Sequence, residues 1–189
     1  MDSNKIDKRD EIIQQAYRVF YKEGFHNAGV DLVLKNTGIS KRTLYKHFQS
    51  KEDLVQAVIE YYSRVSYQAL DQFLSKYTSP AQKILGIFDW LRELVDKKHL
   101  SGCMAINAKL EYSQKNSGIE AQSCLHFQAG ESMFRTFCEE GKLKDPRNTA
   151  KQIQITYLGA VITCQADGNS DAAVAAKSVA KMLINASMD

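Results

Sequence analysis

The segment from Val30 to Leu54 constrains the fold more than any other part of the chain. Gly38 divides its apolar residues into two short runs, and glycine readily adopts the left-handed conformation in which helices commonly end. Ser40 follows, where a side-chain oxygen can accept a hydrogen bond from the free amides of a new helix. Ser50 and Asp53 repeat this capping signal before a long apolar pattern. The segment therefore predicts two short helices joined by a tight turn, followed by a long helix.

The second short helix, at residues 41–48, has two faces of different chemistry. Leu44 and Phe48 are four residues apart, so both can point into a core. The other face carries the basic and hydrogen-bonding side chains of Lys41, Arg42, Thr43, Lys46 and His47. A short helix with an apolar anchor and such a face has the chemistry needed to enter the major groove of DNA. The pattern predicts a helix-turn-helix unit.

The positive charge of the chain is concentrated in this segment. Between Val30 and Lys51 there are five basic residues and one acidic residue, a balance of +4, whereas the whole chain has a formal net charge of +3. The other residues are therefore close to neutral as a set. A positive patch on a nearly neutral body indicates an anionic partner at one defined place.

The remainder of the chain predicts an all-α fold. Only ten glycines and two prolines occur in 189 residues, and long stretches without these residues favour helices. Apolar periodicity indicates nine helices and no convincing strand. The expected helices are residues 8–23, 30–36, 41–48, about 51–75, 81–98, 103–114, 118–141, 149–166 and 171–186.

Patterns typical of enzymes and metal sites are missing from the sequence. We find no Ser-His-Asp set, no glycine-rich phosphate loop and no paired carboxylates on one face beyond chance. The four cysteines are widely spaced and form no CxxC pair, so neither a zinc site nor a disulfide framework is expected. We therefore expect no catalytic residue, no metal and no cofactor.

Membrane and secretion signals are also missing. Residues 1–5 are polar and no apolar run follows them, so we expect no signal peptide. The apolar run at residues 158–163 is far too short to cross a bilayer. We expect a cytoplasmic protein without a membrane partner.

Motifs within about 45 residues of the N-terminal part resemble the TetR family of bacterial transcriptional regulators. They are Gly24-Phe25, Gly38-Ile39-Ser40, Thr43–Phe48 and Ser50–Leu54, in this order and spacing. The resemblance implies a helix-turn-helix DNA-binding domain at residues 1–50. It also implies a helical effector-binding and dimerisation domain at residues 51–189. One departure concerns the start of the first short helix, where Gly29 and Val30 stand in place of the usual hydroxyl.

The resemblance also assigns DNA contacts. Lys41, Arg42 and Thr43 match base-reading positions, and Arg42 can donate two parallel hydrogen bonds to guanine. The positions that usually contact phosphate are matched by Tyr45, Lys46, His47 and Lys51. Other interpretations stay open: the Tyr45 ring can belong to the core, Lys46 can be only solvated, and His47 can be an ordinary donor.

The family's body usually encloses an effector cavity, which would suit a small apolar or aromatic molecule here. Its candidate lining residues are Phe88, Trp90, Met104, Asn107, Phe127, Phe134 and Tyr157. An ordinary helical core explains most of these residues equally well. Glu111 lies four residues after Asn107, so this pair can supply polar contacts to an effector or hydrogen bonds between helices.

Small and branched apolar residues in the last two helices suit a homodimer interface. The candidates are Ile155, Leu158, Gly159, Ile162, Val174 and Val179. The implied function is a repressor that binds a palindromic operator in double-stranded DNA and is released by an effector. A DNA-bound adaptor for a protein partner is an alternative. Another is a redox or electrophile sensor based on Cys103, which can instead be a small buried residue that fills space.

Overall fold

The computed structural model describes residues 7–100, 102–112 and 116–188, and these residues form nine α-helices and no strand. The all-α prediction is confirmed. In chain order the helices are α1 (Lys8–Glu23), α2 (Val30–Leu34), α3 (Lys41–His47), α4 (Lys51–Leu74), α5 (Pro80–Asp96), α6 (Met104–Glu111), α7 (Ser117–Glu140), α8 (Pro146–Asp167) and α9 (Asp171–Ala186).

One difference of three residues from the predicted bounds is at the start of α8. Asp145 has a left-handed backbone (φ 44°), and its side chain accepts a hydrogen bond from the amide of Asn148. Pro146 then occupies the first turn, where a missing N–H costs nothing. The helix therefore begins three residues before the predicted Thr149. The sixth helix, predicted to run to residue 114, ends at Glu111; residues 113–115 lie outside the described residues.

The chain packs into two compact units. The first, called the head unit below, combines the chain up to Val65 with Met104–Cys124. The second, called the body unit, combines Ser66–Cys103 with the chain from Leu125 onward. The division falls inside α4 and α7. It is a division by packing, so the functional boundary expected after residue 50 stays a prediction.

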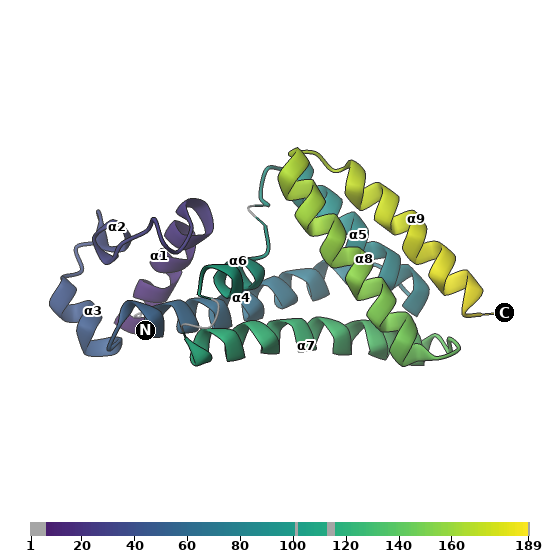
Figure 1. The fold of residues 1–189 in the computed structure, drawn as a ribbon, viewed down its shortest axis with the longest axis horizontal. Coiled ribbons are helices and arrows are strands. Elements are labelled where there is room, and N and C mark those ends of the chain that lie inside the picture. Colours follow the sequence, from purple (N-terminus) through teal and green to yellow (C-terminus); the bar gives the residue numbers. More distant parts are fainter. Residues whose placement is uncertain (1–6, 101, 113–115, 189) are drawn as a thin grey trace, which may run out of the picture. The chain divides into compact units, whose positions relative to one another are not determined.

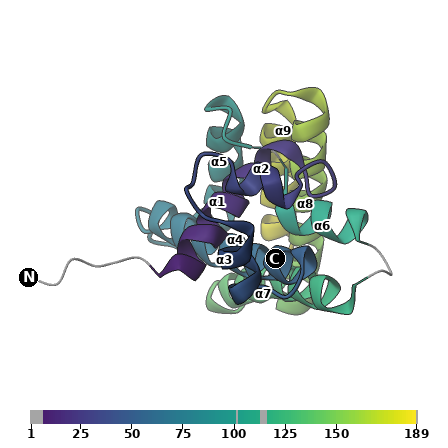
Figure 2. The same ribbon diagram turned by 90° about the vertical axis from the view of Figure 1, so that its left-hand side faces the viewer.

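In the head unit α1, α2 and α3 pack together (Figure 1; Figure 2). Their buried apolar side chains are Ile12, Ile13, Ala16, Phe20, Phe25, Ala28, Val33, Ile39, Leu44 and Phe48. Tyr45 is 50% exposed, so its assignment to the core is wrong. Leu44 already points inward, and the next residue of a helix is rotated away from it by about 100°.

The turn and caps of the head have the predicted chemistry. Gly38 adopts φ +69°, a conformation that costs a residue with a Cβ more than it costs glycine. Ser40 caps α3 by accepting a hydrogen bond from the amide of Thr43. Before α4, Ser50 accepts from the amide of Asp53, while the Asp53 carboxylate accepts from the amide of Gln49. The segment around Val30–Leu54 is therefore defined by local hydrogen bonds.

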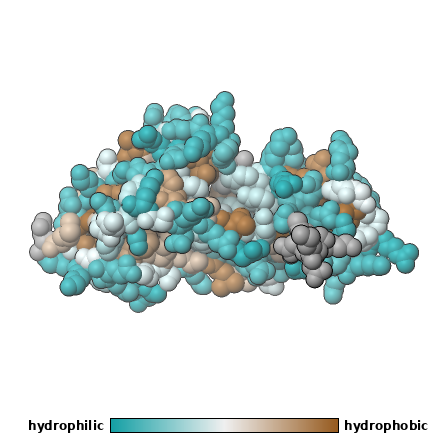
Figure 3. Space-filling model, turned by 180° about the vertical axis from the view of Figure 1, so that it is seen from behind, coloured by the Kyte–Doolittle hydropathy of each residue, from teal (hydrophilic) through white to brown (hydrophobic). Residues whose placement is uncertain are grey.

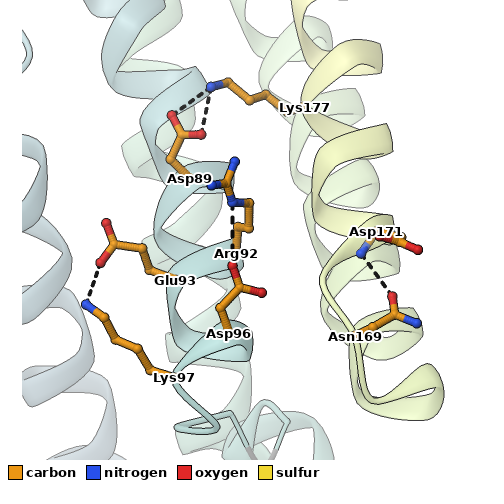
Figure 4. A network of polar contacts seen from close by, with 8 residues as sticks. All are labelled: Asp89, Arg92, Glu93, Asp96, Lys97, Asn169, Asp171 and Lys177. Atoms are coloured by element: carbon orange, nitrogen blue, oxygen red, sulfur yellow. Dashed lines mark hydrogen bonds and ion pairs between the residues drawn. The ribbon is translucent and has the colours of Figure 1, made fainter.

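In the body unit α5, α8 and α9 lie side by side (Figure 1). A polar contact joins two of them, because Lys177 on α9 donates to both carboxylate oxygens of Asp89 on α5 at 2.7 Å (Figure 4). Tyr77 donates to the same carboxylate. These contacts hold the outer helix α9 against α5.

Hydrophilic residues cover most of the face seen in Figure 3, with apolar patches between them. No helix built from the described residues is long and apolar enough to cross a membrane.

Candidate nucleic-acid interface

Helix α3 presents a basic outer face. Leu44 is fully buried, while the predicted contact residues Lys41, Arg42, Tyr45, Lys46 and His47 are all exposed. The Ser40 cap fixes the first turn of the helix, and Leu44 and Phe48 fix its roll against the core. The structure therefore brings together, on one short helix, five side chains that can contact bases or phosphates.

Two of the expected base-reading residues differ in their charge environment. Lys41 forms an ion pair with Asp31 of α2, with Nζ and Oδ1 2.8 Å apart. The hydrogen bond that Lys41 donates to Asp31, together with the negative charge of that carboxylate, raises the pKa of Lys41. No described residue forms an ion pair with Arg42. The guanidinium of Arg42 is thus available to a ligand, whereas Lys41 must leave a carboxylate partner first.

Thr43 is only partly exposed because it belongs to the helix cap. Its hydroxyl lies 2.9 Å from that of Ser40, and its amide donates to the same oxygen at 3.1 Å. The methyl group is the part of Thr43 that this hydrogen bonding leaves unused. A threonine methyl can contact the methyl group of thymine.

Lys51 has a partner inside the head. Its Nζ donates to the backbone carbonyl of Phe25 at 2.6 Å and lies 6.0 Å from the centre of the Phe20 ring. The lysine therefore holds the turn between α1 and α2. Its expected role as a phosphate contact stays a prediction.

The start of α2 has no side-chain cap. Gly29 occupies the N-cap position, and no side-chain hydrogen bond is made there. This agrees with the departure seen in the sequence. Arg9 on α1, which sequence reasoning missed, places its guanidinium 5.3 Å from the centre of the Phe48 ring. It adds a positive charge beside the end of α3.

The candidate effector residues do not form a single group. Phe88, Phe134 and Tyr157 make one ring cluster in the body unit, with centroid distances of 5.7 and 6.1 Å to Tyr157. Trp90 instead lies beside Phe73, with ring centroids 5.1 Å apart, and Phe127 lies against His126. Met104 and Asn107 belong to α6 in the head unit.

Cys103 immediately precedes α6 and is buried. Its Sγ lies 3.7 Å from Nε2 of His126. Burial lowers the pKa of His126 to about 4, so the imidazole is neutral at pH 7 and can accept a hydrogen bond from the thiol. The Tyr67 ring lies tilted against the same imidazole, with ring centres 5.2 Å apart.

The candidate dimer residues are largely exposed. Ile155 and Ile162 on α8 are 63% and 52% exposed, and Val174 and Val179 on α9 are 50% and 38% exposed. Gly159 is exposed and has room for a Cβ, while Leu158 is partly covered.

The first comparison with known proteins concerns the head unit. Residues 12–58 match the model of the bacterial regulatory proteins of the tetR family. This match spans α1, α2, α3 and the first part of α4. Residues 12–58 of the chain therefore belong to the TetR family.

Two curated TetR-type relatives align with about half of the chain. The transcriptional repressor KstR2 of Mycolicibacterium smegmatis is 31% identical over 97 residues, which are 51% of this chain and 47% of KstR2. The regulator UidR of Escherichia coli K12 is 32% identical over 91 residues, which are 48% of this chain and 43% of UidR. The chain therefore spans about half the length of these relatives.

The TetR fold itself extends over nearly the whole chain. The crystal structure of reduced E. coli NemR matches with a TM-score of 0.85 and 20% identity, covering 94% of this chain and 97% of NemR. At this identity the likeness concerns the fold alone. The curated relatives are named as a transcriptional repressor and a transcriptional regulator, in agreement with the expectation that the chain is not an enzyme.

Proposed function

We propose that the chain is a DNA-binding transcriptional regulator, and that it is a repressor which binds a palindromic operator as a homodimer. The observation that carries this proposal is the exposed basic face of α3, held by Leu44, Phe48 and the Ser40 cap. Arg42 reads a guanine in the major groove, and the Thr43 methyl contacts a thymine. Tyr45, Lys46 and His47 contact phosphates and set the register of the helix on the duplex.

Dimerisation is proposed through α8 and α9. Their exposed isoleucine and valine side chains lie on two helices that also pack against each other. In a two-fold dimer the same helix pair from each copy would form a four-helix interface. Two heads would then contact two half-sites about one turn of DNA, or a multiple of it, apart.

Release of the operator is proposed to follow binding of a small apolar or aromatic effector in the body. The ring cluster of Phe88, Phe134 and Tyr157 supports this choice of chemistry. An effector that binds only one of two conformations of the body shifts the population toward it. The conformation it favours must hold the heads where both cannot contact their half-sites.

Selection of DNA from a random library by the purified chain tests the proposal. Sequencing of the retained fragments is expected to give one sequence with two-fold symmetry. Retention without sequence preference, or no retention at low salt, contradicts it. Compounds can then be screened for release of the selected DNA.

A thiol sensor is the second candidate, favoured by the contact of Cys103 with His126. The Cys103 thiol would add across an electrophilic carbon–carbon double bond: its sulfur would bond to one carbon and its proton would pass to the other, while the imidazole accepts the S–H hydrogen bond. A maleimide is then expected to release DNA from the wild type and not from Cys103→Ser. Cys138→Ser is the matched control, because burial raises the pKa of the Cys138 thiol to about 11. Equal release from wild type and Cys103→Ser contradicts the sensor.

A further inference from the structure

The turn between α1 and α2 is bound by a side chain from far along the chain. Glu111, the last residue of α6, accepts hydrogen bonds from the backbone amides of Phe25 at 3.3 Å and of His26 at 2.7 Å. The carboxylate oxygen that faces His26 also lies 3.0 Å from its Nδ1. One carboxylate thus holds two consecutive amides and one imidazole of the head.

The same turn is held from its other side by a cation. Lys51, at the start of α4, donates to the carbonyl of Phe25 at 2.6 Å. The amide of Phe25 is bound by an anion from α6 and its carbonyl by a cation from α4. Hydrogen bonds to charged groups are about twice as strong as those between neutral groups. The turn therefore has a position defined jointly by α4 and α6.

Aromatic packing closes the contact. Tyr112, the residue after Glu111, meets the Phe25 ring at 6.2 Å and the His26 ring at 5.3 Å, both edge to face. Phe25 and Tyr112 are buried. Gly24, with φ +80°, lets the chain leave α1 beside the Glu111 carboxylate, which would lie 3.7 Å from an added Cβ. We call the set of Gly24, Phe25, His26, Glu111 and Tyr112 the latch.

The N-terminal part of the latch immediately precedes α2 and α3, the helices of the proposed DNA-binding unit. Residues 24–28 lead directly to Gly29, the N-cap residue of α2, and α2 packs against α3. On its other side the latch ends α6, whose first residue follows Cys103 of the body unit in the chain. A displacement of α6 along its axis would be passed to the start of α2 through Glu111. The helix α4 is then not the only element through which a movement can reach the head.

We propose that Glu111 is a positioning residue that couples α6 to the orientation of the head, and so sets which half-site spacing the dimer accepts. This rests on the proposed function, in which two heads contact two half-sites. Glu111 touches no DNA in this account. Its effect is to restrict where α2 and α3 lie, which lowers the entropy that a dimer loses when both heads bind.

The test compares Glu111→Ala with the wild type on operators from the DNA selection. Four duplexes are used: the full operator, a single half-site, and two operators with one base pair added or removed between the half-sites. Glu111→Ala is expected to weaken full-operator binding about tenfold and to reduce the preference for the native spacing. Half-site affinity is expected to stay unchanged. Removal of a negative charge alone would strengthen DNA binding, so the expected effect has the opposite sign.

Two further variants sharpen the result. Glu111→Gln keeps an oxygen that can accept from one amide but loses the charge, so it is expected to fall between wild type and Glu111→Ala. Glu60→Ala removes an exposed carboxylate from α4 in the same unit and is expected to keep the wild-type spacing preference. Faster amide hydrogen exchange at Phe25 and His26 in DNA-free Glu111→Ala gives a second readout.

Three results would overturn the proposed positioning role of Glu111. One is an unchanged spacing preference in Glu111→Ala, and another is unchanged amide exchange at Phe25 and His26. The third is an equal loss of half-site and full-operator affinity, because this would mean that the head itself had lost its structure. A wild-type chain that selects no DNA sequence would instead refute the proposed function, before any variant is compared.

Discussion

Arg42 makes the most specific claim about a single side chain. It is exposed at the start of α3, and no described residue forms an ion pair with it. We predict that Arg42→Ala weakens operator binding by about 1–3 kcal/mol and relaxes the preference at one base pair. Fluorescence anisotropy titrations on the operator and on single-base variants measure both effects. Arg147→Ala removes an exposed arginine of α8 and serves as the charge-matched control. Equal affinity of wild type and Arg42→Ala would remove Arg42 from the base-reading set.

His126 predicts how stability depends on pH. Burial lowers its pKa to about 4 from a usual value near 6.5. Between pH 6.5 and about pH 4 the imidazole of the unfolded chain therefore binds a proton that the imidazole of the folded chain does not. The stability that the neutral imidazole provides is complete above pH 6.5, and it falls by up to about 3 kcal/mol as pH approaches 4.

Urea unfolding between pH 7 and pH 4 measures this effect. His126→Gln, which cannot titrate, is expected to show a smaller loss of unfolding free energy over that range. Carboxylates elsewhere titrate in both proteins, so the difference between the two curves isolates the imidazole. Parallel curves would mean that His126 titrates normally in the folded state.

The short helix α3 depends on its N-cap, and this can be tested at the scale of one element. Ser40 accepts from the amide of Thr43 and contacts its hydroxyl. We predict that Ser40→Ala costs about 1 kcal/mol of stability and weakens DNA binding, because the first turn carries Arg42. Ser40→Asp can make the same cap, so its stability is expected to be close to that of the wild type. Thermal unfolding followed by circular dichroism measures the change, and an unaltered melting temperature for Ser40→Ala would contradict the cap.

The helices of this chain could be predicted from the sequence because their signals are local. The bounds of α1 and α9 agree with the apolar periodicity, and the Gly38 turn and Ser40 cap involve neighbouring residues. The start of α8 was missed because Asp145 and Pro146 resemble a loop, although an Asp cap before proline also begins helices.

Contacts between distant residues could not be predicted in the same way. Glu111 accepts hydrogen bonds from Phe25 and His26, which are 86 and 85 positions away in the chain. No local pattern in either segment predicts this contact. The same limit explains why the aromatic residues of the body were predicted as one pocket lining. The structure separates Trp90 from the cluster around Tyr157.

At the scale of the whole molecule, the proposed dimer interface predicts that both self-association and DNA binding need the apolar face of α8. Ile162 is 52% exposed although it is apolar. We predict that Ile162→Glu produces a monomer, because charges gathered in an apolar interface lose their hydration without gaining a partner. Operator affinity should then fall while helical content stays the same. Sedimentation velocity gives the mass, and Gln68→Glu, on an exposed position of α4, is the control. A dimeric Ile162→Glu with normal operator binding would exclude this face as the interface.

The central claim is that two copies of α3 enter the major groove of one operator. Hydroxyl-radical footprinting of the selected fragment tests this most directly, with guanine-methylation interference on the same DNA. We predict two protected stretches related by two-fold symmetry, with centres about 10 base pairs or a multiple of this apart. Interference at one guanine in each half-site should disappear with Arg42→Ala. A single protected stretch, or interference that Arg42→Ala leaves unchanged, would contradict the account.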